Sequence, residues 1–142
     1  MSSFGLNAKN TLDRGSKENT VRNETVLIVD DNPMMRESLR GFLESEGFIV
    51  SCCENGPEAL DLTKEKRFKI VLTDFQMPEM NGDEVARQLR HQDSEAYIIG
   101  FSIASKGEAF LDAGANVFLS KEGLFHNIIP LIRNRAQVFD AP

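Results

Sequence analysis

The chain has 142 residues, of which 41% are hydrophobic and 27% charged, a composition typical of one globular domain with a hydrophobic core. Its net charge of −6 disfavours non-specific binding to nucleic acid or to anionic membranes. No apolar run approaches the ~20 residues of a membrane-spanning helix, and the N-terminus lacks the pattern of a secretory signal. We therefore expect a cytoplasmic protein without membrane insertion or direct nucleic acid binding.

The first 23 residues are rich in Ser, Asn, Thr and Gly, and their few apolar side chains form no amphipathic pattern. This composition predicts a flexible N-terminal extension over residues 1–23. One folded domain is expected over residues 24–139, with no second domain after it.

Short runs of apolar and β-branched residues alternate with segments of helical periodicity through this domain. The predicted strands are Thr25–Val29, Phe48–Cys52, Ile70–Thr73, Tyr97–Phe101 and Asn116–Leu119. The predicted helices start at Asn32 and Asn55, cover Asp83–His91 and Glu108–Ala113, and end with a segment containing Leu124 to Val138. Pro130 is expected to bend or break this last helix because it lacks an N–H group. The alternation predicts an α/β fold, a parallel sheet covered by helices on both faces.

Polar and charged side chains follow four of the predicted strands. Asp30 and Asp31 follow the first strand, Asp74 the third, Ser102 the fourth, and Lys121 lies just beyond the fifth. Because the carboxyl ends of parallel strands meet at one edge of a sheet, these side chains are expected to lie close together.

Three neighbouring carboxylates repel one another, by roughly 4 kcal/mol per pair at about 4 Å and an effective dielectric of about 20. A divalent cation relieves this repulsion, and an all-oxygen site favours Mg²⁺. With the metal and Lys121 present, Asp74 can act as a nucleophile towards a phosphoryl group, and Ser102 can hydrogen-bond one of its oxygens.

Each of these residues also has a simpler explanation. Carboxylates such as Asp30 and Asp31 stabilise the start of a helix, and Ser102 suits a capping role. Lys121 on its own fits a solvated surface, and Phe118 fits the core. Two histidines, His91 and His126, fall away from the predicted edge and are expected at the surface.

Taken together, the strand-end motifs resemble those of a known family. The motifs are Val29–Asn32, Asp74–Gly82, Ser102 and Phe118–Lys121. Over residues 24–138 the chain resembles the receiver domain of bacterial two-component response regulators, of the single-domain, chemotaxis-regulator-like type. The resemblance implies a flavodoxin-like, doubly wound five-stranded sheet with strand order 2-1-3-4-5.

The resemblance also implies a role for each site residue. Asp74 would accept phosphate from a sensor histidine kinase or a histidine phosphotransfer protein. Asp31, Asp74 and the backbone carbonyl of Gln76 would hold Mg²⁺, with Asp30 completing the acidic pocket. Such a protein is a switch that catalyses only its own phosphoryl transfer and dephosphorylation, and it signals to a downstream protein target.

Further residues of the family pattern would carry the signal. The resemblance implies that Lys121 contacts the phosphoryl group, and that Ser102 and Phe118 form a coupled hydroxyl and aromatic switch.

The chain departs from the family pattern on the side that would carry the signal. Glu122 follows Lys121 where the family usually has proline, and Ile103 follows Ser102 where a small residue is usual. The segment between Ser102 and Lys121 is short by roughly one helical turn, so the fourth helix is expected to be shortened.

Two other functions remain open from the sequence. The departures at Ile103 and Glu122 fit a degenerate receiver that binds partners without being phosphorylated. The second is a phosphatase with an aspartyl nucleophile on a similar sheet. Such enzymes generally need Asp-x-Asp after the first strand, whereas here Asp31 is followed by Asn32 and Pro33.

Overall fold

The computed structural model describes residues 23–140, with side chains described through residue 135. The predicted extension over residues 1–23 lies almost wholly outside the described residues. Five strands and five helices alternate along the described part of the chain. The strands are β1 (Thr25–Val29), β2 (Ile49–Cys53), β3 (Ile70–Asp74), β4 (Tyr97–Ser102) and β5 (Val117–Ser120). The helices are α2 (Pro33–Ser45), α3 (Gly56–Glu65), α4 (Gly82–Gln92), α5 (Gly107–Ala113) and α6 (Leu124–Asp140).

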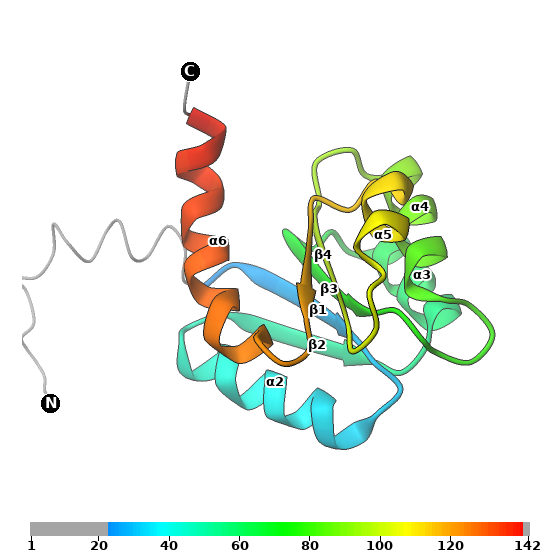
Figure 1. Ribbon diagram of the computed structural model, residues 1–142, viewed down its shortest axis with the longest axis horizontal. Helices are drawn as coiled ribbons and strands as arrows, with labels where there is room; N and C mark the ends of the chain where they lie inside the picture. Colours follow the sequence, from blue (N-terminus) through cyan, green and yellow to red (C-terminus); the bar gives the residue numbers. More distant parts are fainter. Residues whose placement is uncertain (1–22, 141–142) are drawn as a thin grey trace, which may run out of the picture.

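The strands form one parallel sheet in the order β2-β1-β3-β4-β5, which confirms the predicted α/β fold and strand order. Helices α2 and α6 cover one face, and α3, α4 and α5 cover the other (Figure 1). Since every strand runs in the same direction, all the loops that follow the strands emerge at one edge of the sheet.

The central strands are apolar on both faces because each face is covered by helices. In β1, Leu27 and Val29 point into the core beneath α3, α4 and α5, whereas Val26 and Ile28 pack beneath α2 and α6.

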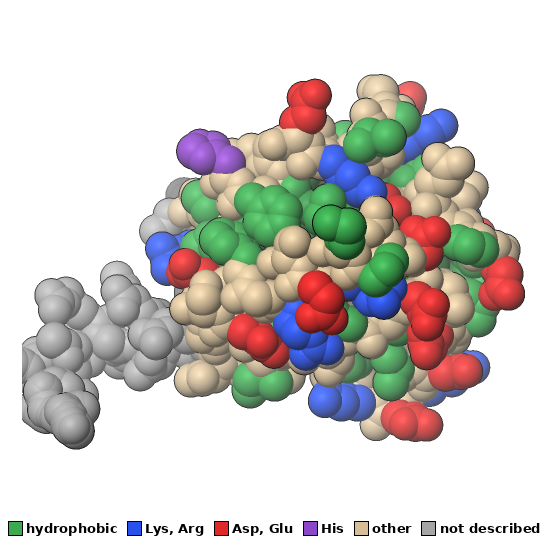
Figure 2. Space-filling view, turned by 90° about the horizontal axis from the view of Figure 1, so that it is seen from below, with side chains coloured by type: hydrophobic (Ala, Val, Ile, Leu, Met, Phe, Trp, Pro, Cys, Tyr) green, Lys and Arg blue, Asp and Glu red, His purple; other side chains and the backbone are tan. Residues whose placement is uncertain are grey.

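The molecular face that Figure 2 shows carries a group of hydrophobic side chains among charged ones. Between α2 and α6, Phe42 and Phe125 meet edge to face at 5.6 Å.

Two strands begin one residue later than predicted. The N–H of Phe48 donates to the carbonyl of Leu43 at 3.1 Å, so it closes the end of α2 before β2 begins at Ile49. Before β5, the side-chain oxygen of Asn116 accepts a hydrogen bond from the N–H of Ile98 at 2.8 Å. The backbone N–H of Asn116 also donates to the carbonyl of Ile98 at 2.8 Å, so Asn116 joins β4 through one backbone bond and one side-chain bond, which hydrophobic periodicity does not reveal.

The sequence predicted a bend or a break at Pro130, and helix α6 runs through this residue, so the break does not occur. Pro130 deprives the carbonyl of His126 of its helical partner, but both residues are exposed and water can solvate that carbonyl. In the part of the chain that the structure describes, no helix is both long and apolar enough to cross a membrane.

The fourth helix of the described chain, α5, has only seven residues. The predicted shortening of this helix is therefore confirmed. The helix ends at Gly114, whose φ of 108° is the left-handed conformation that favours glycine at a helix end. The loop between β4 and α5 starts at the carboxyl end of β4, so it lies at the sheet edge where the predicted site residues are expected.

Candidate functional site

The end of β1 holds one buried and one exposed carboxylate. Asp30 is fully buried, and its Oδ1 accepts the N–H of Asn32 at 2.9 Å. The Asn32 side chain caps α2 by accepting the N–H of Met34 at 2.9 Å. Arg36, one turn into α2, donates to the backbone carbonyl of Asp30 at 2.8 Å. The start of α2 therefore fixes the orientation of Asp30 and leaves Asp31 facing solvent.

Asp74 is the last residue of β3 and is 5% exposed. Its Oδ1 accepts the N–H of Phe75 at 2.9 Å and lies 3.5 Å from Nζ of Lys121. The turn after Asp74 is closed by Gly82, whose N–H donates to the carbonyl of Phe75 at 2.6 Å. A backbone hydrogen bond thus closes the turn after Asp74, and Lys121 places a cation beside the Asp74 carboxylate.

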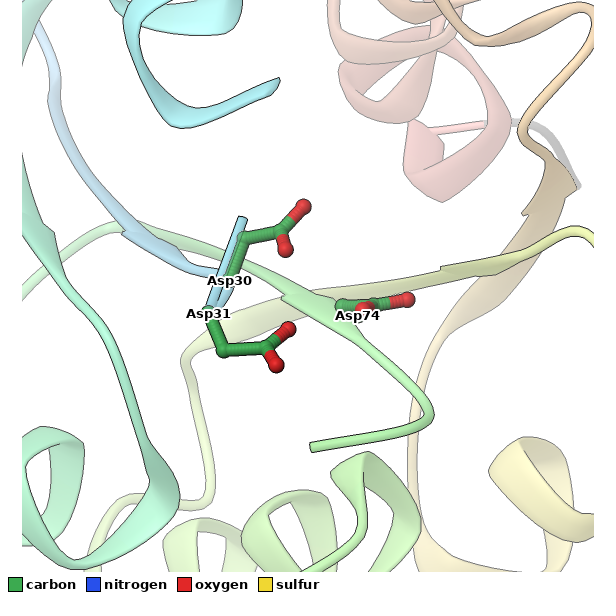
Figure 3. A group of neighbouring side chains, drawn as sticks. All are labelled: Asp30, Asp31 and Asp74. Carbon is green, nitrogen blue, oxygen red and sulfur yellow. The ribbon is translucent and has the colours of Figure 1, made fainter. Parts of the chain in front are cut away.

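The three carboxylates converge at the sheet edge, as the sequence predicted. Asp30, Asp31 and Asp74 each place one oxygen within 4.8 Å of the other two (Figure 3). Oδ2 of Asp30 is buried and, within residues 23–135, has no hydrogen-bond partner. A buried acceptor without a partner, next to two further carboxylates, fits a hard divalent cation with oxygen ligands.

The electrostatics of the site follow from this crowding. Burial raises the pKa of Asp30 to about 6, the hydrogen bond from Asn32 opposes this, and repulsion from Asp74 adds to it. Burial also raises the pKa of Asp74, against the attraction of Lys121 and the hydrogen bond from Phe75. The free energy of the site therefore falls when positive charge enters it.

Ser102 and Lys121 lie side by side at the ends of β4 and β5. The backbone N–H of Lys121 donates to the carbonyl of Ser102 at 2.9 Å. Ser102 is 4% exposed, and its Oγ accepts the N–H of Ala104 at 3.0 Å. Because this bond uses a lone pair, the hydroxyl proton stays available to another acceptor. Phe118 is half-buried in β5, with its ring 5.9 Å from that of Phe110.

The remaining predicted residues lie at the margin of the site or away from it. Gln76 is exposed in the loop that follows Asp74. Both histidines are exposed, as expected, with His91 near the end of α4 and His126 in the first turn of α6.

The departures from the family pattern have clear positions. Ile103 is 82% exposed, so its bulk lies in solvent and not in the packing around Phe118. Glu122 is exposed in a tight turn in which the N–H of Leu124 donates to the carbonyl of Lys121 at 3.4 Å. In this structure, neither residue prevents Lys121 from reaching Asp74.

The sequence placed Gly82 in a motif but assigned no packing role to it or to Gly100, and the structure shows that both are closely packed. A Cβ atom on Gly82 would lie 2.0 Å from the backbone oxygen of Asp74, and one on Gly100 would lie 2.4 Å from the Phe110 ring. Both positions therefore require glycine. The signal was present for Gly100, because a glycine inside an apolar strand often marks the close approach of another group.

A family model, the response regulator receiver domain, matches residues 26–133. The chain belongs to this family. Response regulator MprA of Mycobacterium sp. (strain KMS) is 37% identical over 111 residues, which are 76% of this chain and 48% of MprA. The receiver domain thus spans about half the length of the curated relatives it matches.

Solved structures show the same fold. The response regulator TrrA from Thermotoga maritima, in complex with Mg²⁺-BeF, has 29% identity and a TM-score of 0.73, with 78% of this chain and 97% of TrrA covered. The receiver domain of the histidine kinase CKI1 from Arabidopsis thaliana, complexed with Mg²⁺ and BeF₃⁻, has 30% identity and a TM-score of 0.70, with 84% and 95% covered. Receiver domains are phospho-switches of two-component systems that bind Mg²⁺ at an acidic pocket.

Proposed function

We propose that this receiver domain is phosphorylated on Asp74 by a sensor histidine kinase or a histidine phosphotransfer protein, and that it signals through protein contacts. The observation that carries the proposal is the buried Asp74 carboxylate, which lies 3.5 Å from Nζ of Lys121 and beside two further carboxylates. A carboxylate in this setting is oriented for attack and has a cation beside it to balance the charge of the incoming group.

In the proposed transfer, an Asp74 oxygen attacks phosphorus while the phosphorus–nitrogen bond of the donor phosphohistidine breaks. The products are an acyl phosphate on Asp74 and an imidazole, which takes a proton. Lys121 is proposed to contact the phosphoryl group, and the Ser102 hydroxyl to donate a hydrogen bond to one of its oxygens. Attack of water on phosphorus later restores the carboxylate and releases inorganic phosphate.

Asp31, Asp74 and the backbone carbonyl of Gln76 are proposed to hold Mg²⁺, with Asp30 completing the acidic pocket. The unpartnered Oδ2 of Asp30 and the all-oxygen donor set support this assignment. When bound, Mg²⁺ neutralises charge on the phosphoryl oxygens. Ser102 and Phe118 are the proposed switch that responds to the phosphoryl group.

Phosphorylation is tested by incubating the full chain with acetyl phosphate and Mg²⁺ and measuring the intact mass. We expect one added phosphoryl group, which Asp74→Asn abolishes because an amide oxygen is a poor nucleophile. The control is Asp61→Asn, which removes an exposed carboxylate from α3 and should still be labelled. Natural protein that stays unlabelled would contradict the proposal and favour phosphorylation-independent binding, and turnover of small phosphomonoesters would favour the phosphatase.

Addition of Mg²⁺ to the chelator-treated protein is expected to raise its melting temperature, because an ion that binds only the folded state stabilises it by mass action. The gain is about 2.7 kcal/mol when the free ion is a hundredfold above its dissociation constant. Asp31→Asn should reduce the gain, whereas Gln76→Ala should keep it because its proposed ligand is a backbone oxygen. Equal melting temperatures in chelator and in saturating Mg²⁺ would contradict a metal site.

A further inference from the structure

The Phe110 ring fills a space that two glycines leave at the sheet. Phe110 of α5 is fully buried, and its Cγ would lie 2.4 Å from a Cβ on Gly100 of β4. On the other side, its Cζ would lie 3.0 Å from a Cβ on Gly82, the residue that closes the Asp74 turn. The ring leaves no room for a side chain at Gly100, and at Gly82 it would be in tight contact with a Cβ that the backbone oxygen of Asp74 already excludes. The ring is therefore wedged between the central sheet and the Asp74 turn.

From this position Phe110 contacts two aromatic residues with different roles. Phe75, which directly follows Asp74, meets the Phe110 ring edge to face at 5.6 Å and 81°. Phe118 of β5 packs on Phe110 at 5.9 Å and 30°. Such ring pairs contribute beyond the area they bury. The three rings thus form a continuous chain from the proposed phospho-acceptor to the proposed switch residue.

The two ends of α5 are held differently. At its C-terminal end, Arg90 of α4 donates two hydrogen bonds to the carbonyl of Gly114, at 3.0 and 2.9 Å. At its N-terminal end, Nζ of Lys106 lies 5.0 Å from the centre of the Phe75 ring. The contact with Phe75 thus links the N-terminal end of α5 to the Asp74 turn, whereas hydrogen bonds from Arg90 hold the C-terminal end.

We propose that Phe110 is a positioning residue that couples the Asp74 turn, through Phe75, to Phe118. This packing route runs in parallel with the route through the Ser102 hydroxyl. This inference rests on the proposed phosphorylation of Asp74 and adds a residue on α5 to its regulation. The coupling is carried by packing, since close-packed rings transmit a displacement that a void would absorb.

The test is a double-mutant cycle that uses beryllofluoride with Mg²⁺ as the probe. Calorimetry measures the affinity of the full chain and of the variants Phe110→Leu, Phe118→Leu and the pair. We expect Phe110→Leu to weaken binding about fivefold and Phe118→Leu to change it by a similar factor. In the Phe110→Leu background, Phe118→Leu should change the affinity less than about twofold.

Nuclear magnetic resonance adds a second measurement, the chemical shifts of individual amides, which does not depend on the overall stability of a variant that is folded. On addition of the probe, the amide signals of Phe75 and Phe118 should both shift in the natural chain. In Phe110→Leu the shift at Phe75 should persist, whereas the shift at Phe118 should be clearly smaller than in the natural chain, because only the route through the Ser102 hydroxyl remains. If Phe110→Leu does not fold, Phe110→Met replaces it in both experiments, because methionine keeps most of the side-chain volume but lacks the ring.

Two control variants separate this route from others. Phe42→Leu breaks an aromatic pair of the same 5.6 Å separation on the opposite face of the sheet, and it should leave the affinity and the Phe118 shift unchanged. In the Ser102→Ala background, Phe118→Leu should still change the affinity, because the proposed route does not use the hydroxyl.

The outcomes distinguish this inference from the proposed function. If the natural chain binds the probe and Phe118→Leu has the same effect in both Phe110 backgrounds, Phe110 does not couple the two sites and only this inference is overturned. If the natural chain does not bind the probe, the proposed function itself is overturned, and this inference falls with it.

Discussion

Replacing Gly82 with alanine is expected to destabilise the domain by about 3 kcal/mol, the upper part of the usual range for overpacking. The new Cβ would lie 2.0 Å from the backbone oxygen of Asp74. Gly82 cannot move away freely, because its N–H donates to the carbonyl of Phe75 at 2.6 Å. Relief therefore requires a shift of the Asp74 turn, and Gly82→Ala should also weaken Mg²⁺ binding. Urea unfolding and a Mg²⁺ titration measure the two effects.

The matched control is Gly41→Ala in α2. Apart from its chain neighbours and the backbone of its own helix, no atom of the described residues lies within 4 Å of a Cβ at Gly41, which is exposed in the middle of the helix. Alanine is favoured over glycine there by about 0.5–1 kcal/mol, so this variant should be slightly more stable than the natural protein. Equal stability of the two alanine variants would show that the Asp74 turn tolerates a side chain at position 82.

Asp30→Asn is expected to stabilise the metal-free protein at pH 7 by up to about 3 kcal/mol, which is the free energy equivalent of the raised pKa. The pKa of Asp30 is about 6 in the folded state against 3.8 ordinarily, chiefly because the residue is buried. Asp30 thus holds its proton more tightly in the folded state than in the unfolded state. The free energy of unfolding of the natural protein therefore falls as the pH rises from about 4 to about 6, and it stays low above pH 6.

The difference in free energy of unfolding between the natural protein and Asp30→Asn should therefore shrink as the pH is lowered and vanish near pH 4. Unfolding curves in the presence of chelator across this pH range measure this difference. The nearby groups that alter the titration are Asp74 and Asp31, which raise the pKa of Asp30, and Lys121, which lowers it. Asp61→Asn on the exposed face of α3 is the control and should keep the natural pH dependence. A natural protein whose stability does not change between pH 4 and pH 7 would contradict the prediction.

The convergence of the site could be predicted because it depends on local pattern and one topological rule. Apolar runs identify the strands, and each strand of a parallel sheet presents its carboxyl end at the same edge. This reasoning brought Asp74 and Lys121 together, and their charged atoms lie 3.5 Å apart in the structure. The roles of these residues in phosphoryl transfer remain proposals.

The incorrect predictions have a common cause, which is that local rules omit what a neighbouring element supplies. Periodicity alone predicted that β5 begins at Asn116, which joins Ile98 through one backbone bond and one side-chain bond. The proline rule predicted a bend or a break at Pro130, but α6 continues through a position where Pro130 and His126 are both exposed. In the first case the partner is a residue of the neighbouring strand β4, and in the second the residues concerned lie at the exposed surface, and the local sequence indicates neither.

The order of the elements, the residues at each strand end and the acidic character of the site follow from the local sequence. The full burial of Asp30 and the position of the Phe110 ring between Gly82 and Gly100 depend on how the elements pack. The difference lies in the range of the interactions. Strand and helix patterns arise from neighbours a few residues apart, whereas burial and ring contacts arise when β4, α4 and α5 pack together.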